Sequence, residues 1–136
     1  MDFGAGAIRK VVGANHFAIH TGTEDLRTQM EMFARARLVV GAHGAGLSNL
    51  LFSDPGTRVV LFPMKPHVDH TFAHLVAALD QKLYVMPEIN SNYYGHYGKL
   101  KSSLIKQVKT LVKNILAEDK AERHGASSSD RDSADL

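Results

Sequence analysis

The chain has 136 residues, a length that suits one folded domain with its own hydrophobic core. Hydrophobic residues make up 44% and charged residues 22% of the chain, which excludes a fibrous protein or a wholly disordered one, and the absence of cysteine excludes disulfides and thiolate metal sites. The formal net charge of +2 is too small and too dispersed for a surface that neutralises phosphates, so we predict no nucleic-acid partner.

The chain opens with a segment, residues 1–16, that contains Gly4 and Gly6 and lacks the charged-then-apolar order of a signal peptide. We treat these residues as an N-terminal segment preceding the folded domain, and we expect any targeting segment to lie outside this chain. Residues 17–20 are a short, weakly apolar run, and a Thr-Gly-Thr turn follows them at 21–23. This pattern predicts a strand and then a turn.

A capped amphipathic helix is predicted next. From Glu24 the apolar residues follow helical spacing, with acids in the first turn and arginines at the end. Residues 38–40 are apolar on both faces, which is typical of a buried parallel strand. This strand leads into a glycine-rich loop and then into an apolar stretch, 47–52, so the unit is expected to be strand, loop and helix.

The same alternation continues down the chain. A Ser-Asp-Pro-Gly turn at 53–56 precedes a second strand, 58–62, and helical spacing returns at 72–79. A third core strand is predicted at 83–86, closed by Pro87. Strands that alternate with helices through short connections form a parallel sheet covered by helices, with right-handed crossovers. We therefore predict an α/β fold, a Rossmann-like domain over residues 17–118.

The last part of the chain has three different patterns. Residues 90–99 form a polar loop rich in tyrosine and glycine, whose rings either pack within the loop, the favoured interpretation, or stack on a base or sugar. One apolar stripe from Leu100 to Leu116 predicts a long final helix. From Asp119 the composition becomes polar and serine-rich, so we predict a disordered tail over 119–136.

The glycine loop is the strongest candidate for a binding site. Gly41, Gly44 and Gly46 lie where a buried strand passes into a helix, and a backbone without side chains there can turn tightly and approach a ligand closely. The helix N-terminus favours an anion, and ligands of open α/β sheets bind beyond the carboxyl ends of the strands. A nucleotide diphosphate fits this position. The Gly-x-x-Gly-x-Gly spacing lacks both the dinucleotide fingerprint and the P-loop ending, which disfavours nicotinamide and ATP chemistry.

Three polar residues of the loop each allow two interpretations. His43 either donates to a phosphate oxygen or a sugar hydroxyl, or it bonds to nearby backbone, and the two interpretations carry equal weight. Ser48 and Asn49 stand in the first helical turn, where they either cap backbone N–H groups or touch the ligand. For these two residues capping is favoured.

For two further groups of side chains we favour an interpretation that involves no ligand or partner. His67, His70 and His74 lie close in sequence beside Asp69, but the spacing lacks a complete zinc-ligand pattern, so a polar helix face is expected. The final helix is basic, which would suit a membrane surface or a calmodulin-like partner, but a solvated face is favoured. Its lysines are Lys99, Lys101, Lys106, Lys109 and Lys113.

The sequence around the loop resembles glycosyltransferase family 61, whose members include plant arabinoxylan xylosyl- and arabinosyltransferases and animal O-linked N-acetylglucosaminyltransferases. The resemblance covers roughly residues 17–86 and is weak outside them. It rests on Gln29, on Met32-Phe33-Ala34-Arg35-Ala36, on the run Leu38-Val39-Val40-Gly41-Ala42-His43-Gly44-Ala45-Gly46-Leu47-Ser48-Asn49-Leu50-Leu51-Phe52, on Pro55-Gly56 and on Val59-Val60.

The resemblance implies a two-domain GT-B architecture, of which this chain is similar to the carboxyl-terminal, donor-binding domain. It implies that a UDP-sugar is the donor, that a hydroxyl of a glycan or glycoprotein is the acceptor, and that transfer proceeds with inversion. The residues implied at the diphosphate and sugar are His43, Gly44, Ala45, Gly46, Ser48 and Asn49, with Gln29 nearby. No cofactor or metal is expected, because helix dipoles and basic side chains stabilise the leaving diphosphate. The resemblance also implies that the protein resides in the lumen of the Golgi or endoplasmic reticulum. The chain itself contains no apolar run close to the roughly 20 residues that are needed to span a bilayer.

The chain departs from the family pattern in two ways. Leu61 stands where family members usually have a glutamate, and the amino-terminal GT-B domain that would hold the acceptor is missing. We therefore expect the chain alone to be inactive, and prone to self-association through an uncovered apolar stripe on its final helix. The alternative hypothesis is a non-catalytic domain that binds a nucleotide or a protein partner.

Overall fold

The computed structural model describes residues 4–63, 70–86 and 102–132. The chain divides into two compact units. The first spans Ala18–Gly98 and holds the sheet, and the second combines Asp2–Phe17 with Lys99–Leu136. The final helix is thus grouped with the first residues of the chain rather than with the sheet.

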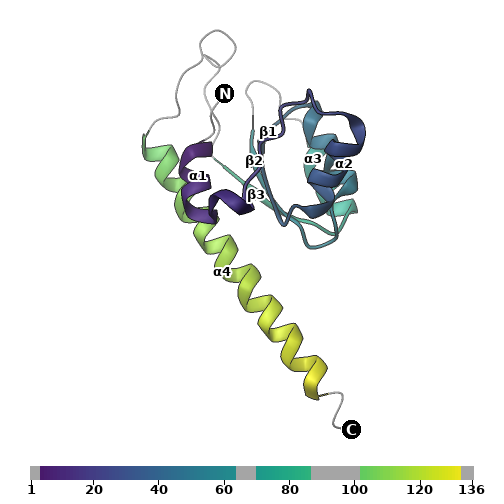
Figure 1. The fold of residues 1–136 in the computed structure, drawn as a ribbon, viewed down its shortest axis with the longest axis vertical. Helices are drawn as coiled ribbons and strands as arrows, with labels where there is room; N and C mark the ends of the chain where they lie inside the picture. Colours follow the sequence, from purple (N-terminus) through teal and green to yellow (C-terminus); the bar gives the residue numbers. More distant parts are fainter. Residues whose placement is uncertain (1–3, 64–69, 87–101, 133–136) are drawn as a thin grey trace. The chain divides into compact units, whose positions relative to one another are not determined.

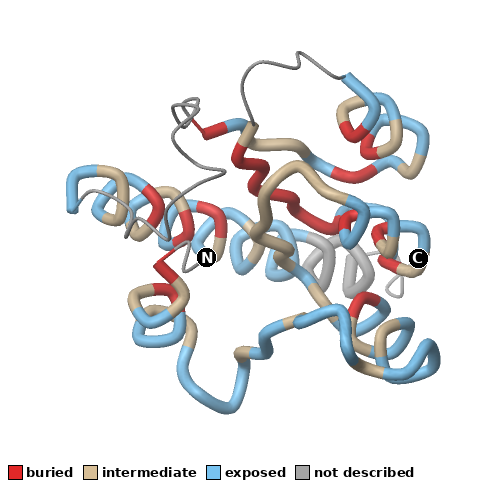
Figure 2. Tube along the Cα trace, turned by 90° about the horizontal axis from the view of Figure 1, so that it is seen from above, coloured by how far each residue is buried: buried red, intermediate tan, exposed pale blue. Residues whose placement is uncertain are grey.

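The first unit is built on three parallel strands. These are β1 (Leu38–Ala42), β2 (Arg58–Phe62) and β3 (Lys82–Val85), hydrogen-bonded in the order β1-β2-β3. All five residues of β2 are buried, and Figure 2 shows this strand as a continuous buried segment. A central strand without an exposed residue is expected of a parallel sheet, and it explains why its sequence is almost wholly apolar. The predicted α/β, Rossmann-like class is confirmed.

One face of this sheet carries all the helices of the unit. They are α2 (Leu26–Arg35), the 3-10 helix η2 (Ala45–Phe52) and α3 (Thr71–Ala78), and Figure 1 shows α2 and α3 together beside the strands. The strands advance in one direction, so connections of one hand place η2 and α3 on the same face. The buried core between these helices and the sheet consists of Phe33, Leu47, Leu50, Val59, Leu61, Phe72 and Val76.

Two elements differ from the sequence prediction. Residues 17–20 form no strand: Ile19 is 60% exposed, so the run has no apolar face to bury in a sheet, and the ring of His20 bonds to the Gln29 side chain. The helix after the loop is a 3-10 helix that begins at Ala45. Bonds between residues three apart at both of its ends, Leu47 N to Gly44 O and Ser53 N to Leu50 O, fix the tighter winding.

Buried polar side chains hold the far end of η2. The Gln81 side chain, 8% exposed, donates from Nε2 to the carbonyls of Leu50 (3.0 Å) and Ser53 (3.2 Å), and the Ser53 hydroxyl donates to Phe33 O at 2.8 Å. These bonds satisfy carbonyls that a helix end leaves without intrahelical partners. They fix η2 to the end of α2 and to the start of β3, so the loop before η2 has a rigid base.

The second unit pairs two helices distant in sequence. Helix α1 (Ala5–Val12) precedes a 3-10 turn, η1 (Ala14–His16), and packs on α4 (Ser102–Asp132). The apolar stripe of α4 is confirmed, and its centre is not bare: Val108, Val112 and Ile115 are at most 2% exposed. The sequence did not predict helix α1, because its first residues include two glycines and its N-terminus has no side-chain cap. Burial of Ile8 stabilises this helix instead.

Helix α4 continues to Asp132, beyond Asp119, where the polar composition predicted the end of ordered structure. An ion pair between Arg123 Nη2 and Asp119 Oδ2, at 2.9 Å, connects two consecutive turns in this region. Such pairs favour a helix even where no apolar side chain is buried. Among the helices that the structure describes, none is long and apolar enough to cross a membrane.

Candidate functional site

The site lies at the edge of the sheet where the parallel strands end. The backbone N–H of His43 donates to Phe62 O at 3.1 Å, so the chain leaves β1 still paired to β2. The ring of His43 stands edge-on to the ring of Phe72 on α3, with centroids 4.9 Å apart. These contacts place His43 at the carboxyl edge of the sheet, where open α/β sheets bind ligands.

The three glycines of the loop have different reasons to lack a side chain. None has a φ in the left-handed region, and the φ of Gly44, 173°, is extended backbone that any residue adopts. A Cβ on Gly41 would lie 3.2 Å from Leu47 Cδ2, and one on Gly46 would lie 3.4 Å from His20 Cε1. The expected tight turn is therefore not what requires these glycines. Leu47 crowds the space beside Gly41, whereas a Cβ at Gly46 would make a near-ordinary contact with His20.

Gly44 is the exception. Among the described residues, a Cβ built on it meets nothing closer than Ala42 O at 3.9 Å, so this part of the structure leaves open space over the backbone. The first hydrogen bond of η2 runs from Leu47 N to Gly44 O, so the N–H groups of Ala45 and Gly46 precede the helical ladder. Both residues are exposed, and neither N–H has a hydrogen-bond partner within the described part of the chain. The eight aligned residues of η2 give this end a partial positive charge.

Neither Ser48 nor Asn49 caps η2, because no side chain bonds to the backbone at its N-terminus. Ser48 is exposed on the first turns of the helix. Asn49 instead donates from Nδ2 to Gln29 Oε1 at 3.1 Å, which joins η2 to α2. The capping interpretation is thus wrong for both residues, and the structure brings together Gln29 and Asn49, which are twenty positions apart.

Gln29 is the centre of a small hydrogen-bond network. Its Oε1 lies 3.2 Å from His20 Nε2, and its Nε2 donates to the backbone carbonyl of Glu24 at 2.7 Å. The His20 ring is also held edge-on against Phe33, with centroids 5.3 Å apart. Sequence reasoning missed His20, since the run that contains it was interpreted as a strand. The network fixes the rim of the loop on the side of α2.

A carboxylate that the sequence analysis treated as an ordinary first-turn acid belongs to the same rim. Glu24 accepts hydrogen bonds from Thr21 N (2.8 Å), the Thr21 hydroxyl (2.8 Å) and Gly22 N (2.9 Å). These bonds, above all the one from Thr21 N, lower the pKa of Glu24 from 4.5 to about 2. The Thr-x-x-Glu spacing is that of a capping box, which was the available sequence signal. An ionised carboxylate therefore lies 3.7 Å from His20 Nε2.

The histidines near α3 show no metal-binding arrangement within the described residues. The rings of His70 and His74 are tilted, with centroids 6.4 Å apart, and both residues are exposed. His67 and the tyrosine- and glycine-rich loop at 90–99 lie outside the described residues. No group of three or more histidine, aspartate or glutamate side chains able to hold a metal occurs in residues 4–63, 70–86 and 102–132.

A parallel sheet with helices packed on it and a glycine loop at its carboxyl edge defines a Rossmann-like fold, in which ligands commonly bind at that edge. The family model Glycosyltransferase 61 matches residues 5–60, a short region that runs from α1 into β2 and includes the loop and Gln29. Over these residues the chain is similar to glycosyltransferase family 61. No curated protein and no solved structure matches the chain.

Leu61, the position where the family pattern has a glutamate, belongs to the hydrophobic core. Its side chain is 7% exposed and packs in the cluster beneath α2, η2 and α3. A carboxylate in this place would be enclosed by apolar side chains, so leucine suits the packing of this chain. Residue 61 also lies just beyond the matched region.

Proposed function

We propose that this chain is the donor-binding part of a UDP-sugar-dependent transferase that glycosylates a hydroxyl of a glycan or glycoprotein. The observation that carries the proposal is the open backbone at Gly44, beside the His43 ring and the uncovered N–H groups of Ala45 and Gly46. Exposed N–H donors at a helix N-terminus suit the oxygens of a diphosphate. The family match supports the transferase class.

In this proposal the loop acts on the leaving group. The N–H groups of Ala45 and Gly46 and a ring N–H of His43 donate to the diphosphate, and they stabilise the charge that develops as the bond to the sugar breaks. No metal takes part in this proposal, because these donors would supply the stabilisation of the leaving diphosphate. The Gln29–Asn49 pair, with Ser48 beside it, forms the rim where the sugar lies.

The transfer itself is a single displacement. The acceptor hydroxyl attacks the anomeric carbon from the face opposite UDP, a new glycosidic bond forms, the bond to UDP breaks, and the hydroxyl proton passes to a base. We assign the base and the acceptor site to the amino-terminal domain of a GT-B enzyme. Residence in the Golgi or endoplasmic reticulum lumen is part of the same proposal.

Calorimetry of UDP binding to the chain tests the proposal. We expect weak but measurable binding, because one of the two GT-B domains is present. His43→Ala should weaken it by roughly three- to thirtyfold, the loss of one or two hydrogen bonds to a charged group. His74→Ala is the matched control, since it removes an exposed histidine elsewhere in the same unit and should leave the affinity unchanged.

A bulkier side chain at Gly44 provides a second variant. Gly44→Val should abolish UDP binding and leave the circular dichroism spectrum unchanged, because the added atoms fill the open space over the loop. Equal UDP affinity in the wild type and in both loop variants would refute the site.

A non-catalytic nucleotide-binding domain is the second candidate, and the buried Leu61 in place of a glutamate favours it. Because the base and the acceptor site are assigned to another domain, the two candidates differ in turnover only when the amino-terminal domain of a GT-B enzyme is added to the assay. Release of free UDP from a UDP-sugar in the presence of the wild-type chain, and its loss in His43→Ala, would favour the enzyme. Tight binding of UDP with no release from any donor would favour the binding domain.

A further inference from the structure

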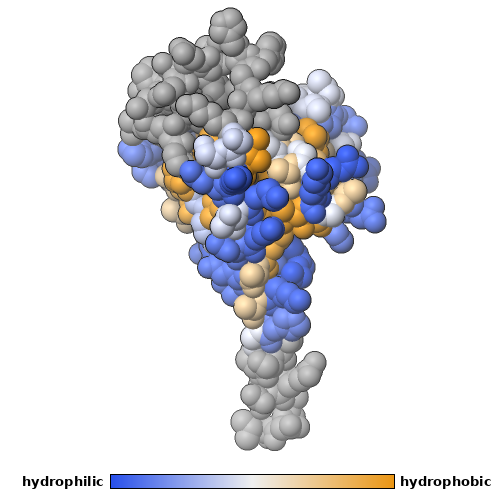
Figure 3. All heavy atoms as spheres, turned by 90° about the vertical axis from the view of Figure 1, so that its left-hand side faces the viewer, coloured by the Kyte–Doolittle hydropathy of each residue, from blue (hydrophilic) through white to orange (hydrophobic). Residues whose placement is uncertain are grey.

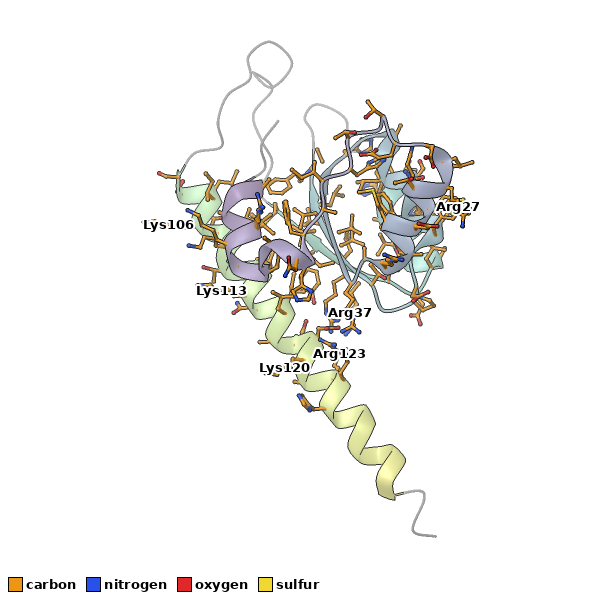
Figure 4. All side chains as sticks on the ribbon, viewed as in Figure 1. Arg27, Arg37, Lys106, Lys113, Lys120 and Arg123 are labelled. Atoms are coloured by element: carbon orange, nitrogen blue, oxygen red, sulfur yellow. The ribbon has the colours of Figure 1, made fainter. Side chains whose placement is uncertain are left out.

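A row of lysines runs along one face of α4. Lys106, Lys109, Lys113 and Lys120 follow the three-, four- and seven-residue spacing of a single helix face, and Figure 4 labels three of them along the helix. The row covers about 21 Å at a rise of roughly 1.5 Å per residue. Within the described part of the chain, none of these four lysines takes part in an ion pair.

Helix α1 adds a fifth lysine and turns the row into a groove. Lys10 lines a surface hollow of about 400 Å³ together with Lys109 and Lys113, and its apolar part is formed by Val11 and Leu116. A second hollow, which begins at Lys106 and shares no residue with the first, is lined by uncharged polar side chains on the other side of the lysine row. These are Gln107, Thr110 and Asn114, with Leu111 beside them. Figure 3 shows the hydrophilic side chains of this face on both sides of a narrow apolar strip.

The charge on this face has one sign. Residues 4–17 and 102–117 contain no aspartate or glutamate, and the first acids of α4, Glu118 and Asp119, point away from the lysine row on the helical wheel. Like charges three and four positions apart weaken a helix, so the row does not serve the stability of α4. Its arrangement suits a ligand that brings the missing negative charge.

We propose that the lysine groove binds a linear acidic polysaccharide, a chain of sugars with carboxylates at regular intervals. A row of several cations along one helix face matches a polymer that carries several negative charges, and lysine ammonium groups act as point charges that tolerate unequal spacing and need no fixed orientation of each carboxylate. The amide and hydroxyl groups of Gln107, Thr110 and Asn114 suit sugar hydroxyls. The apolar side chains of Val11 and Leu116 suit the less polar face of a sugar ring.

Other anionic partners fit the same surface less well. A helix that binds a bilayer inserts its apolar face, but the apolar face of α4, at Val108, Val112 and Ile115, is already buried. Proteins that bind single-stranded nucleic acid stack its bases on aromatic rings, and neither hollow is lined by an aromatic side chain. Both partners are outcomes of the test.

The test is direct binding of short oligogalacturonides to the whole chain, measured by calorimetry at low salt. Lys109→Gln with Lys113→Gln should weaken binding roughly three- to thirtyfold, because each exposed charge pair contributes up to about fivefold. Arg27→Gln with Arg35→Gln is the matched control: it lowers the net charge by the same two units on α2, outside the groove. It should leave binding unchanged, and circular dichroism checks that both variants fold.

Uncharged maltooligosaccharides, oligouridylate and phosphatidylserine vesicles complete the comparison. The proposal holds if the oligogalacturonide binds most tightly and only the groove variant weakens it. It is overturned if the oligogalacturonide does not bind, if both double variants weaken it equally, or if the RNA, the vesicles or an acidic peptide binds more tightly. UDP affinity should not change in the groove variant, and oligogalacturonide affinity should not change in His43→Ala, so failure of one site is distinguishable from failure of the other.

Discussion

Coupling between Gln29 and Asn49 is the sharpest test of the site geometry. Gln29→Ala removes three hydrogen bonds, to Asn49 Nδ2, His20 Nε2 and the Glu24 carbonyl, at 2.7 to 3.2 Å. A hydrogen bond contributes about 0.5–1.5 kcal/mol net, and these partly buried ones belong at the low end, so we expect a loss of about 1.5–3 kcal/mol. Asn49→Ala should cost about 0.5–1 kcal/mol.

The double variant should therefore cost less than the sum of the two single ones, by about 0.5–1 kcal/mol, because the shared bond is lost only once. Urea unfolding followed by NMR signals of α2 and η2 measures the stability of this unit separately from that of α4. Gln29→Ala combined with Lys106→Ala is the control pair, and its effects should add. Additivity of the Gln29 and Asn49 variants within about 0.3 kcal/mol would show that the network does not exist in solution.

Three further variants test other parts of the unit. Folding lowers the pKa of Glu24 from 4.5 to about 2, so the ionised carboxylate stabilises the fold above pH 4.5, and this stabilisation is lost as the pH falls through about 2. Glu24→Gln should remove this part of the acid sensitivity. An NMR titration of Glu24 with a midpoint near 4.5 would contradict the prediction. Asp25→Ala should destabilise α2 by about 0.5–2 kcal/mol in thermal unfolding, whereas Asp25→Asn keeps the cap, so equal losses in both would exclude capping. Gly41→Val should lower the free energy of unfolding by about 1–3 kcal/mol, because it crowds Leu47. Gly44→Ala should leave the free energy of unfolding unchanged and weaken UDP binding. A larger loss of stability in Gly44→Ala than in Gly41→Val would refute the packing described for the loop.

The core strands were predictable because their signal is local. The β2 segment is apolar at nearly every position, and a strand buried on both faces needs that composition whatever its neighbours are. The long apolar stripe of α4 was predictable for a similar reason, since Val108, Val112 and Ile115 repeat at helical spacing. Helix α1 carried no such signal, because its stability comes from packing on a helix nearly a hundred positions away.

The candidate site was predictable in composition but not in arrangement. The resemblance named both Gln29 and Asn49, yet nothing in their spacing of twenty positions indicates that their side chains bond to each other. His20 was hidden because residues 17–20 look like a strand, and only the tertiary contact with Phe33 shows the position of its ring. Tertiary contacts of this kind are what a pattern along one chain does not contain.

The unequal crowding around the loop glycines has a consequence for how the sequence can change over generations. Replacement of Gly41 is disfavoured by packing, because Leu47 must shift to admit even a Cβ. Gly44 is under no such constraint, so folding alone would allow it to drift to alanine or serine. Selection that keeps glycine at position 44 among descendants of this chain would therefore act through the ligand. Descendants with another residue at position 44 are then expected to have lost donor binding.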